Sequence, residues 1–181
     1  DEVCPGPLNT MSYLQAIANY IITDLNEDVI QWTTPSGFPV IYENYVMEDI
    51  KWKSWISDMR IQHVGNEPRL VYNKKIASPG GFASGISPNF IHSMDAAHMA
   101  LIISHWDGEF AELHDSFSTH ARNVNDLLDL TKTIFIAMYD HKDYYEEIRH
   151  MLLENPEKFK YDYKLGNLNI KDIANSNYFF S

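Results

Sequence analysis

The sequence predicts one structural unit of the α+β class, in which helices pack against short β-hairpins. Apolar residues recur at helical spacing over residues 10–25, 85–106 and 123–138, which predicts three amphipathic helices. Two other stretches, 60–76 and 109–120, contain β-prone runs on either side of a turn, which predicts two hairpins. With 45% hydrophobic residues among 181, the chain is long enough and apolar enough to bury one core.

The first helix is expected to start at Thr10, which would serve as its N-cap. Its buried stripe is expected to comprise Met11, Leu14, Ile17, Ala18, Ile21, Ile22 and Leu25. The stretch WTTPSGFPV, residues 32–40, follows the helix. Its two prolines and one glycine favour an extended, turned path over a helix.

The hairpin over residues 60–76 is centred on GNEP and carries basic residues on its arms. The next stretch, ASPGGFASG, is expected to form a flexible loop. Ser87 then caps the second helix, with Pro88 at its first helical position. A helical wheel puts His92 and Asp95 outside the apolar stripe, whose inward-facing members are Ile91, Met94, His98, Leu101, Ile102 and His105.

Residues 109–120 read EFAEL, then the HDS turn, then FSTH, and are expected to form two strands joined by a tight turn. Asn123 is the expected cap of the third helix, with Asp126 three residues later as in a weak capping box. The buried stripe of that helix is expected to be Val124, Leu127, Leu128, Thr131, Ile134, Phe135 and Met138.

The charge distribution is uneven. The net charge of −11 argues against a protein that binds nucleic acid over its whole surface, because phosphates are contacted by Lys and Arg. Residues 51–75 nevertheless carry a net charge of +4, which leaves −15 for the remainder. An ordinary solvated loop explains such a run as well as a binding strip does.

The composition also bears on the compartment. Cys4 is the single cysteine, so no disulfide can form within the chain, which fits a reducing cytosol. No run of 18 apolar residues and no signal-peptide pattern is visible, so neither a membrane span nor secretion is expected. Because the chain starts at Asp1 rather than at a methionine, we expect a fragment, a processed product or one subunit of a larger assembly.

Asp115, in the stretch ELHDSFSTH, is the main candidate for chemistry. A carboxylate at the tip of a strand-turn-strand unit is held by the strands and projects from the turn. Mg²⁺ prefers such oxygen ligands and often takes only one or two of them from protein. The alternative is that Asp115 only stabilises the turn through its side chain, which is common for aspartate.

His114 and Asp115 also form an HD pair, which together with His92, His98 and Asp126 or Asp129 is similar to the sites of HD-type metal phosphohydrolases. Those sites are built on helices, whereas the pair here is flanked by predicted strands. His98 and His105 of the second helix fall on an apolar stripe, where a packed core histidine is expected rather than a metal ligand. An HD-type phosphohydrolase is therefore a remote alternative.

Four separated motifs carry a resemblance to a known family. In order, these are WTTPSGFPV, GISPNFIHSMDAAHM, ELHDSFSTH and GNLNIKDIANSNYFFS. Together they closely resemble the C-terminal part of the single-subunit DNA-dependent RNA polymerases of bacteriophages and mitochondria, over roughly residues 12–181. The resemblance implies the C-terminal part of a right-hand polymerase, with a palm motif C hairpin packed on helices.

The resemblance divides the unit, residues 1–181, into three parts. Residues 1–59 would form a helix and a fingers-like connection, residues 60–84 a basic hairpin and loop like the family's specificity loop, and residues 85–181 the palm part with motif C and a C-terminal foot. In the specificity loop, Arg reads guanine and Lys contacts phosphate. The DNA-binding candidates are Arg60, Arg69, Lys74 and Lys75.

The resemblance also implies the chemistry. Asp115 matches one of two aspartates that bind the catalytic Mg²⁺ ions of nucleotidyl transfer. The second aspartate, on motif A, and the nucleotide-binding motif B lie upstream in the family and are not found here. The chain alone is therefore expected to be inactive, and a second polymerase chain would supply motifs A and B, as in a split phage enzyme.

Other residues take their implied roles from the same match. His114 would support the metal site, and His92 would lie near the nascent base pair of the template and RNA, whereas structural support is at least as reasonable for Asp95 and His98. The C-terminal foot would comprise Tyr178, Phe179, Phe180 and Ser181.

The implied partners are the DNA template, the nascent RNA, nucleoside triphosphates and an accessory promoter or single-strand DNA-binding factor, with no membrane. The implied location is the cytoplasm, of an infected bacterium for a phage source. The alternative from another class is a non-catalytic subunit that keeps the fold to bind DNA or a polymerase.

Overall fold

The computed structural model describes residues 5–49, 73–113, 116–141 and 143–176 of the chain. Its helices are α1 (Pro5–Asn19), continued by the π-helical η1 (Tyr20–Asp24), α2 (Pro79–His105), α3 (Val124–Tyr139) and α4 (Tyr144–Leu152), with 3₁₀ turns η2 (Ala121–Asn123), η3 (Pro156–Lys158) and η4 (Ile170–Asn175). Its strands are β1 (Ile30–Thr33), β2 (Pro39–Tyr42), β3 (Tyr45–Asp49), β4 (Asn73–Ala77), β5 (Ala111–Leu113) and β6 (Ser116–Ser118).

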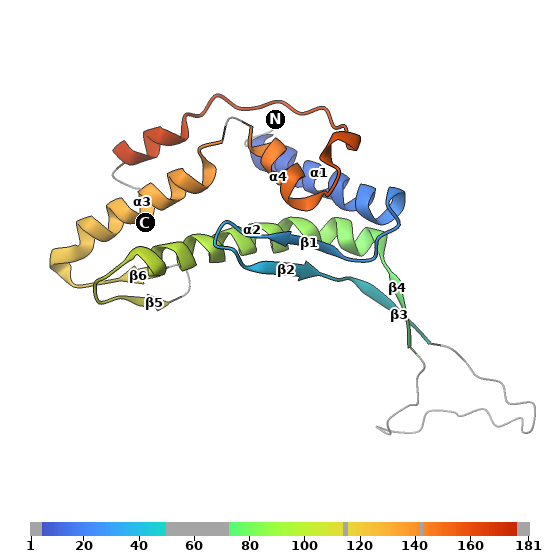
Figure 1. Ribbon diagram of the computed structural model, residues 1–181, viewed down its shortest axis with the longest axis horizontal. Coiled ribbons are helices and arrows are strands. Elements are labelled where there is room, and N and C mark those ends of the chain that lie inside the picture. The colour runs from blue at the N-terminus through green and yellow to red at the C-terminus, as the bar shows by residue number, and fades with distance from the viewer. Residues whose placement is uncertain (1–4, 50–72, 114–115, 142, 177–181) are drawn as a thin grey trace, which may run out of the picture.

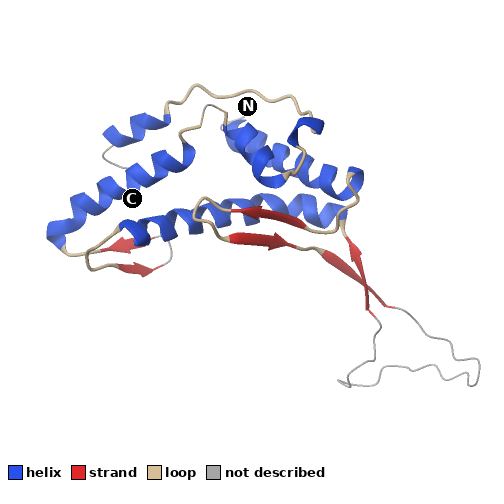
Figure 2. Ribbon diagram, viewed as in Figure 1, coloured by secondary structure: helices blue, strands red, loops and turns tan. Residues whose placement is uncertain are grey.

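The described strands form three two-stranded antiparallel sheets, β1–β2, β3–β4 and β5–β6. The long helix α2 runs through the middle of the molecule (Figure 1). Figure 2 shows helices α1, α3 and α4 on one side of α2 and strands β2, β5 and β6 on the other. This mixture of helices with small hairpins confirms the α+β class. Within the described part of the chain, no helix is long and apolar enough to cross a membrane.

The core lies along α2. Phe82, Ile86 and Phe90 of this helix are fully buried, and α2 packs against α1. The β1–β2 hairpin packs on the same helix, since the Trp32 indole N–H donates to Ser93 Oγ at 2.9 Å. The predicted extended path over residues 32–40 is therefore the second half of β1, its turn and the start of β2.

Helix α1 begins at Pro5, five residues before the predicted start. The prediction of Thr10 as N-cap is wrong, because Thr10 lies inside the helix and its hydroxyl donates to the Gly6 carbonyl at 3.1 Å. Prolines are tolerated in a first helical turn, where the missing N–H has no intrahelical partner. Met11 and Leu25, predicted to be buried, are 40% and 45% exposed.

Helix α2 begins at Pro79, so the predicted flexible loop is helical. Ser78 is the N-cap, and its Oγ accepts from the Gly81 N–H at 3.3 Å. Ser87 and Pro88 lie inside the helix rather than at its start, and the predicted boundary at residue 85 falls within it. The inward-facing stripe also differs, because Ile91 and His105 are exposed.

Two glycines in the first half of α2 lie where neighbouring residues leave no room for a Cβ. A Cβ at Gly81 would lie 2.6 Å from Asn44 Oδ1, and a Cβ at Gly85 would overlap the Tyr42 hydroxyl. The Tyr42 hydroxyl donates to the Gly81 carbonyl at 3.1 Å. The glycines therefore allow the end of β2 to approach the helix backbone closely.

The hairpin β3–β4 differs from the predicted hairpin centred on GNEP. Residues 73–77 pair with residues 45–49, in a register that places Lys75 opposite Met47 and Lys74 opposite Glu48. Residues 50–72, between these strands, lie outside the described part of the chain. The two strands extend away from the body of the molecule (Figure 1).

Helix α3 starts one residue after Asn123, as predicted, but within the described residues the Asn123 side chain makes no capping hydrogen bond. Val124, predicted to be buried, is 49% exposed. Helix α4 was not predicted. Asp143 caps it by accepting from the Glu146 N–H at 3.2 Å.

An extended segment, residues 159–169, which we call the strap, connects η3 to η4. In Figure 1 it passes from α1 and α4 at one end to η4 beside α3 at the other. Its first half is attached through Tyr13, whose ring meets those of Tyr161 and Tyr163 edge-on at centroid distances of 5.3 and 5.5 Å. The strap thus joins the two ends of the helical layer.

Candidate functional site

The hairpin β5–β6 has the predicted strand-turn-strand form. Its register pairs Leu113 with Ser116 and Ala111 with Ser118. Two residues, His114 and Asp115, connect the paired strands, and both lie outside the described part of the chain. A two-residue connection is typical of a tight β-hairpin.

Side-chain contacts hold the open end of this hairpin. The rings of Phe110 and Phe117 lie 5.7 Å apart and pack against the core. The Thr119 hydroxyl and the Trp106 indole N–H both donate to the Glu109 carbonyl, at 2.7 and 3.3 Å. The hairpin is therefore anchored at its base, next to the end of α2.

His92 lies on the exposed side of α2, one position before Ser93, which accepts the hydrogen bond from Trp32. This agrees with its predicted position outside the apolar stripe.

His98 is buried, at 6% exposure, and its Nε2 lies 3.1 Å from the Thr131 carbonyl of α3. A carbonyl only accepts, so the neutral imidazole carries its proton on Nε2. Burial lowers the pKa of His98, and the Thr131 hydrogen bond and the Asp95 carboxylate partly oppose this effect. His98 therefore links α2 to α3 and is placed for structural support.

Asp95 is exposed, but its charge reaches the α2–α3 interface. Burial raises the pKa of Tyr139 to about 12, and the nearby Asp95 carboxylate adds to this rise. Tyr139 in turn packs against Tyr144 of α4, with ring centroids 5.2 Å apart. His105, expected to face inward, instead lies at the exposed end of α2, where its Nδ1 is 2.8 Å from the Leu101 carbonyl.

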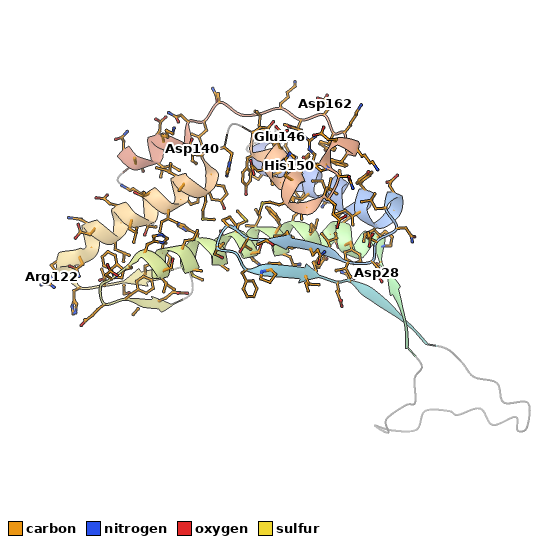
Figure 3. The ribbon with its side chains drawn as sticks, viewed as in Figure 1. Asp28, Arg122, Asp140, Glu146, His150 and Asp162 are labelled. Atoms are coloured by element: carbon orange, nitrogen blue, oxygen red, sulfur yellow. The ribbon has the colours of Figure 1, made fainter. Side chains whose placement is uncertain are left out.

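Among residues 5–49, 73–113, 116–141 and 143–176, no three or more His, Cys, Asp or Glu side chains are grouped to hold a metal ion. Four acidic or histidine side chains, Asp143, Glu146, Glu147 and His150, do line an open cavity of about 350 Å³ on α4. They are not arranged to hold a metal ion together. Figure 3 shows Glu146 and His150 on α4 below the strap, far from the hairpin β5–β6.

Of the predicted DNA-binding residues, Lys74 and Lys75 lie on β4, and Arg60 and Arg69 lie outside the described residues. Residues 177–181, which include Phe179, Phe180 and Ser181 of the predicted foot, also lie outside them.

The chain immediately before the predicted foot is anchored. Asn169 caps η4 by accepting from the Lys171 N–H at 3.2 Å, and the Lys171 ammonium lies 3.0 Å from Asp140 at the end of α3. Contacts between η4 and α3 hold this turn on the helical layer.

A second group of candidate residues, which runs from the end of η3 into the start of the strap, was not predicted from the sequence. The stretch KFKYDYK, residues 158–164, alternates charged and aromatic side chains. In this stretch Phe159 is buried and Tyr163 is half-buried, whereas the charged side chains and Tyr161 are exposed. This period-2 pattern was the signal that could have identified it.

Comparison with known proteins identifies the family. A family model described as DNA-dependent RNA polymerase matches residues 1–165, so the chain belongs to the DNA-dependent RNA polymerase family. This match confirms the family resemblance that the four sequence motifs indicate.

Similar proteins come from plant organelles and from phages. The chain is 32% identical to DNA-directed RNA polymerase 2, chloroplastic/mitochondrial, of Arabidopsis thaliana, over 100% of this chain and 17% of that protein. It is 29% identical to DNA-directed RNA polymerase 3B, chloroplastic, of Nicotiana tabacum, over 99% of this chain and 18% of that protein. For the DNA-directed RNA polymerase of Enterobacteria phage T3 the identity is 25%, over 96% of this chain and 22% of that protein. The chain spans about a fifth of the length of these relatives.

Proposed function

We propose that this chain is the C-terminal palm and fingers part of a DNA-directed RNA polymerase and contributes a catalytic carboxylate, Asp115. The observation that carries the proposal is the β5–β6 hairpin, whose two connecting residues are the HD pair that matches palm motif C. Family membership over residues 1–165 includes this hairpin.

The reaction is template-directed nucleotidyl transfer. The 3′-oxygen of the RNA forms a bond to the α-phosphorus of a nucleoside triphosphate, the bond to pyrophosphate breaks, and the 3′-hydroxyl loses its proton. Bound Mg²⁺ supplies Lewis-acid stabilisation of the attacking and leaving oxygens. Asp115 fits this ion by chemistry, because a carboxylate is the oxygen ligand that Mg²⁺ prefers.

Asp115 alone does not complete a metal site. A two-metal site needs carboxylates from more than one place, and the described residues offer no acidic cluster that would complete it near β5–β6. We therefore propose that a second chain, or a further part of the polymerase, supplies motif A with the other aspartate and motif B with the nucleotide-binding residues.

His92 and His114 take supporting roles in the proposal. The exposed position of His92 on α2 supports contact with the template–RNA hybrid, and His114 would shape the turn beside the RNA 3′ end. Neither group is needed as a metal ligand.

The β3–β4 hairpin is proposed to contact promoter DNA. Its extension from the body supports this role, as does the basic composition of residues 51–75. Lys74 and Lys75, both on β4, are the candidates for phosphate contact within the described part of the chain. Arg60 and Arg69 remain candidates from the sequence alone.

The source decides the compartment. Plant organellar and phage polymerases are both among the relatives, and a phage source implies the cytoplasm of the infected bacterium. An accessory promoter or single-strand DNA-binding factor stays part of the proposal.

Isolation of the chain with its native partner tests the proposal. The mass and sequence of the copurifying chain are determined, and Mg²⁺-dependent RNA synthesis on a DNA template is measured with and without it. We expect a partner that carries motifs A and B, and synthesis only by the complex. A complex that binds DNA but makes no RNA would instead identify a non-catalytic binding subunit.

A further inference from the structure

A second cavity, of about 580 Å³, lies between the end of the first helix and the start of the strap. The helical side contributes Tyr20 and Asp24, and the other side contributes Lys158, Phe159, Lys160 and Tyr161. The cavity therefore combines three aromatic rings with two ammonium groups and one carboxylate. Nothing in the proposed catalytic role uses these residues.

The three lysines of residues 158–164 are exposed to solvent, and two of them, Lys158 and Lys160, also line the cavity. Lys158, Lys160 and Lys164 are exposed, whereas Phe159 is 6% exposed and Tyr163 is half-buried. Residues 158–164 carry three lysines and one acid, Asp162, a local charge of +2 in a chain of −11. Figure 3 shows Asp162 on the outer side of the strap.

The aromatic rings of the cavity are fixed by their neighbours. The rings of Phe159 and Tyr161 are nearly parallel, at 9°, with centroids 6.3 Å apart, and Tyr20 lies 5.3 Å from Phe159. Tyr13 meets Tyr161 edge-on at 5.3 Å, which holds the Tyr161 ring from the core side. Tyr161 is nevertheless 38% exposed. It thus presents a positioned aromatic surface to solvent.

We propose that this cavity binds single-stranded nucleic acid, with a base stacked on Tyr161 and phosphates at Lys158 and Lys160. Single-strand sites combine aromatic rings, on which any base can stack, with a basic path for the backbone. A purely apolar partner would leave the two ammonium groups without a counter-charge beyond Asp24. The site goes beyond the proposed function, because it requires neither Asp115 nor the β3–β4 hairpin.

The test uses the full chain and an eight-nucleotide uridine oligomer that contains 4-thiouridine. Crosslinking by light, followed by peptide mapping, is expected to mark the peptides that contain Tyr20 or Tyr161. Binding is measured by fluorescence anisotropy over a range of salt concentrations. An eight-nucleotide thymidine oligomer in competition distinguishes RNA from DNA as the preferred strand.

Four variants make the test specific. K158Q/K160Q should weaken binding and reduce the slope of log K against log salt by about 1.4, for two lost phosphate contacts. Tyr161→Leu should weaken binding about fivefold or more through lost stacking. Asp24→Asn should tighten binding, because it removes the one carboxylate of the cavity. Lys164→Gln, which removes one positive charge from the same strap but outside the cavity, should leave binding nearly unchanged.

The β3–β4 hairpin emerges at the same end of the molecule as the end of α1 (Figure 1), so Lys75→Gln serves as a further control. Loss of oligomer binding in K75Q but not in K158Q/K160Q would overturn the cavity proposal and leave the polymerase proposal intact. An absence of oligomer binding, or crosslinks confined to other peptides, would also overturn it. If the cavity binds the oligomer but the assembled complex makes no RNA, the proposed function is contradicted and the cavity proposal stands.

Discussion

His92 and His98 lie six residues apart on one helix and have opposite surroundings. His92 is exposed and free to meet a ligand, whereas His98 is enclosed between α2 and α3 and bonded to the Thr131 carbonyl. Burial therefore assigns a packing role to His98, whereas His92 is the histidine proposed to contact the template–RNA hybrid. A wheel drawn on the sequence separated these two correctly but placed His105 wrongly, because the helix end projects past the core.

The burial of His98 makes stability depend on pH. Its pKa is lowered in the folded state, so the unfolded chain binds the proton more tightly. The stabilisation from neutral His98 is therefore complete above the ordinary pKa of about 6.5 and is lost as pH falls below it, toward the lower folded value. Unfolding by urea at pH 5 to 8 should show this loss for the unaltered chain.

His98→Gln is the matched variant, because the glutamine amide can donate to Thr131 but does not titrate. We expect a lower free energy of unfolding at pH 7, by about 1–3 kcal/mol, and a weaker pH dependence below 6.5. His92→Gln, at an exposed position, should change neither. An unchanged pH dependence in H98Q would contradict the assignment of His98 as a buried neutral donor.

At the level of elements, α2 shows where local sequence signals are insufficient. Glycines 80, 81 and 85 and Pro88 predict a loop with a later helix start, yet the helix covers them all. Tertiary packing explains two of these glycines, because β2 and Asn44 approach the helix so closely that side chains at residues 81 and 85 would collide. Propensity is a weak guide where packing of this kind decides the outcome.

Two glycines of α2 give a paired prediction. Gly80→Ala should stabilise the chain by up to about 1 kcal/mol, because alanine is the better helix former and its Cβ meets nothing within 4 Å. Gly85→Ala should destabilise it despite the same gain in propensity, since the new methyl group would overlap the Tyr42 hydroxyl. Thermal unfolding of both variants measures the difference.

The double variant G85A/Y42F identifies the cause. Removal of the Tyr42 hydroxyl also removes its hydrogen bond to the Gly81 carbonyl, so we expect partial recovery relative to G85A. If G85A is as stable as G80A, the close approach of β2 to α2 does not hold in solution.

The sequence carries a signal for the start of α4, although this helix was not predicted. Asp143 as N-cap, Glu146 and Glu147 in the first turn and the buried Ile148 follow the usual pattern of a helix start. The strands β3 and β4 are the opposite case. Their pairing joins residues separated by 23 others, and no local pattern specifies that partner.

In the whole molecule, the strap connects the aromatic contacts of Tyr13 on α1 to η4, which packs on α3. The last described residues therefore lie beside α3. The ion pair of Lys171 with Asp140 and the contacts of η4 with α3 fix the chain up to residue 176. The family resemblance implies that the residues after it fold toward the active site. Residues added after Ser181 would then have to be accommodated beside that site.

A C-terminal extension should therefore impair the assembled polymerase. Addition of a short peptide after Ser181 is expected to reduce RNA synthesis, and its removal by a protease should restore the rate. The same peptide before Asp1 serves as the control for the effect of the tag itself. Full activity with the C-terminal extension in place would show that the foot has no role in catalysis.

The overall class and the hairpin β5–β6 could be predicted from the sequence, because alternation and tight turns are local features. The proposed metal-binding role of Asp115 in the HD pair comes from the family motifs, because the local pattern alone leaves a turn-stabilising role equally open. The cavity beside Tyr161 could not be predicted, since it depends on the strap packing on α1, more than 130 residues away in the chain. Long-range packing of this kind has no local sequence signature.

Asp115 is proposed to be a carboxylate of the catalytic metal site. The most direct measurement is Mg²⁺-dependent RNA synthesis by the assembled polymerase that carries Asp115→Asn, beside Glu112→Gln, which alters an exposed carboxylate on the same hairpin. We predict that D115N loses at least about a hundredfold in rate while it still binds DNA, and that E112Q retains its activity. Synthesis by D115N at the rate of the unaltered complex would contradict the claim and leave this chain a binding subunit.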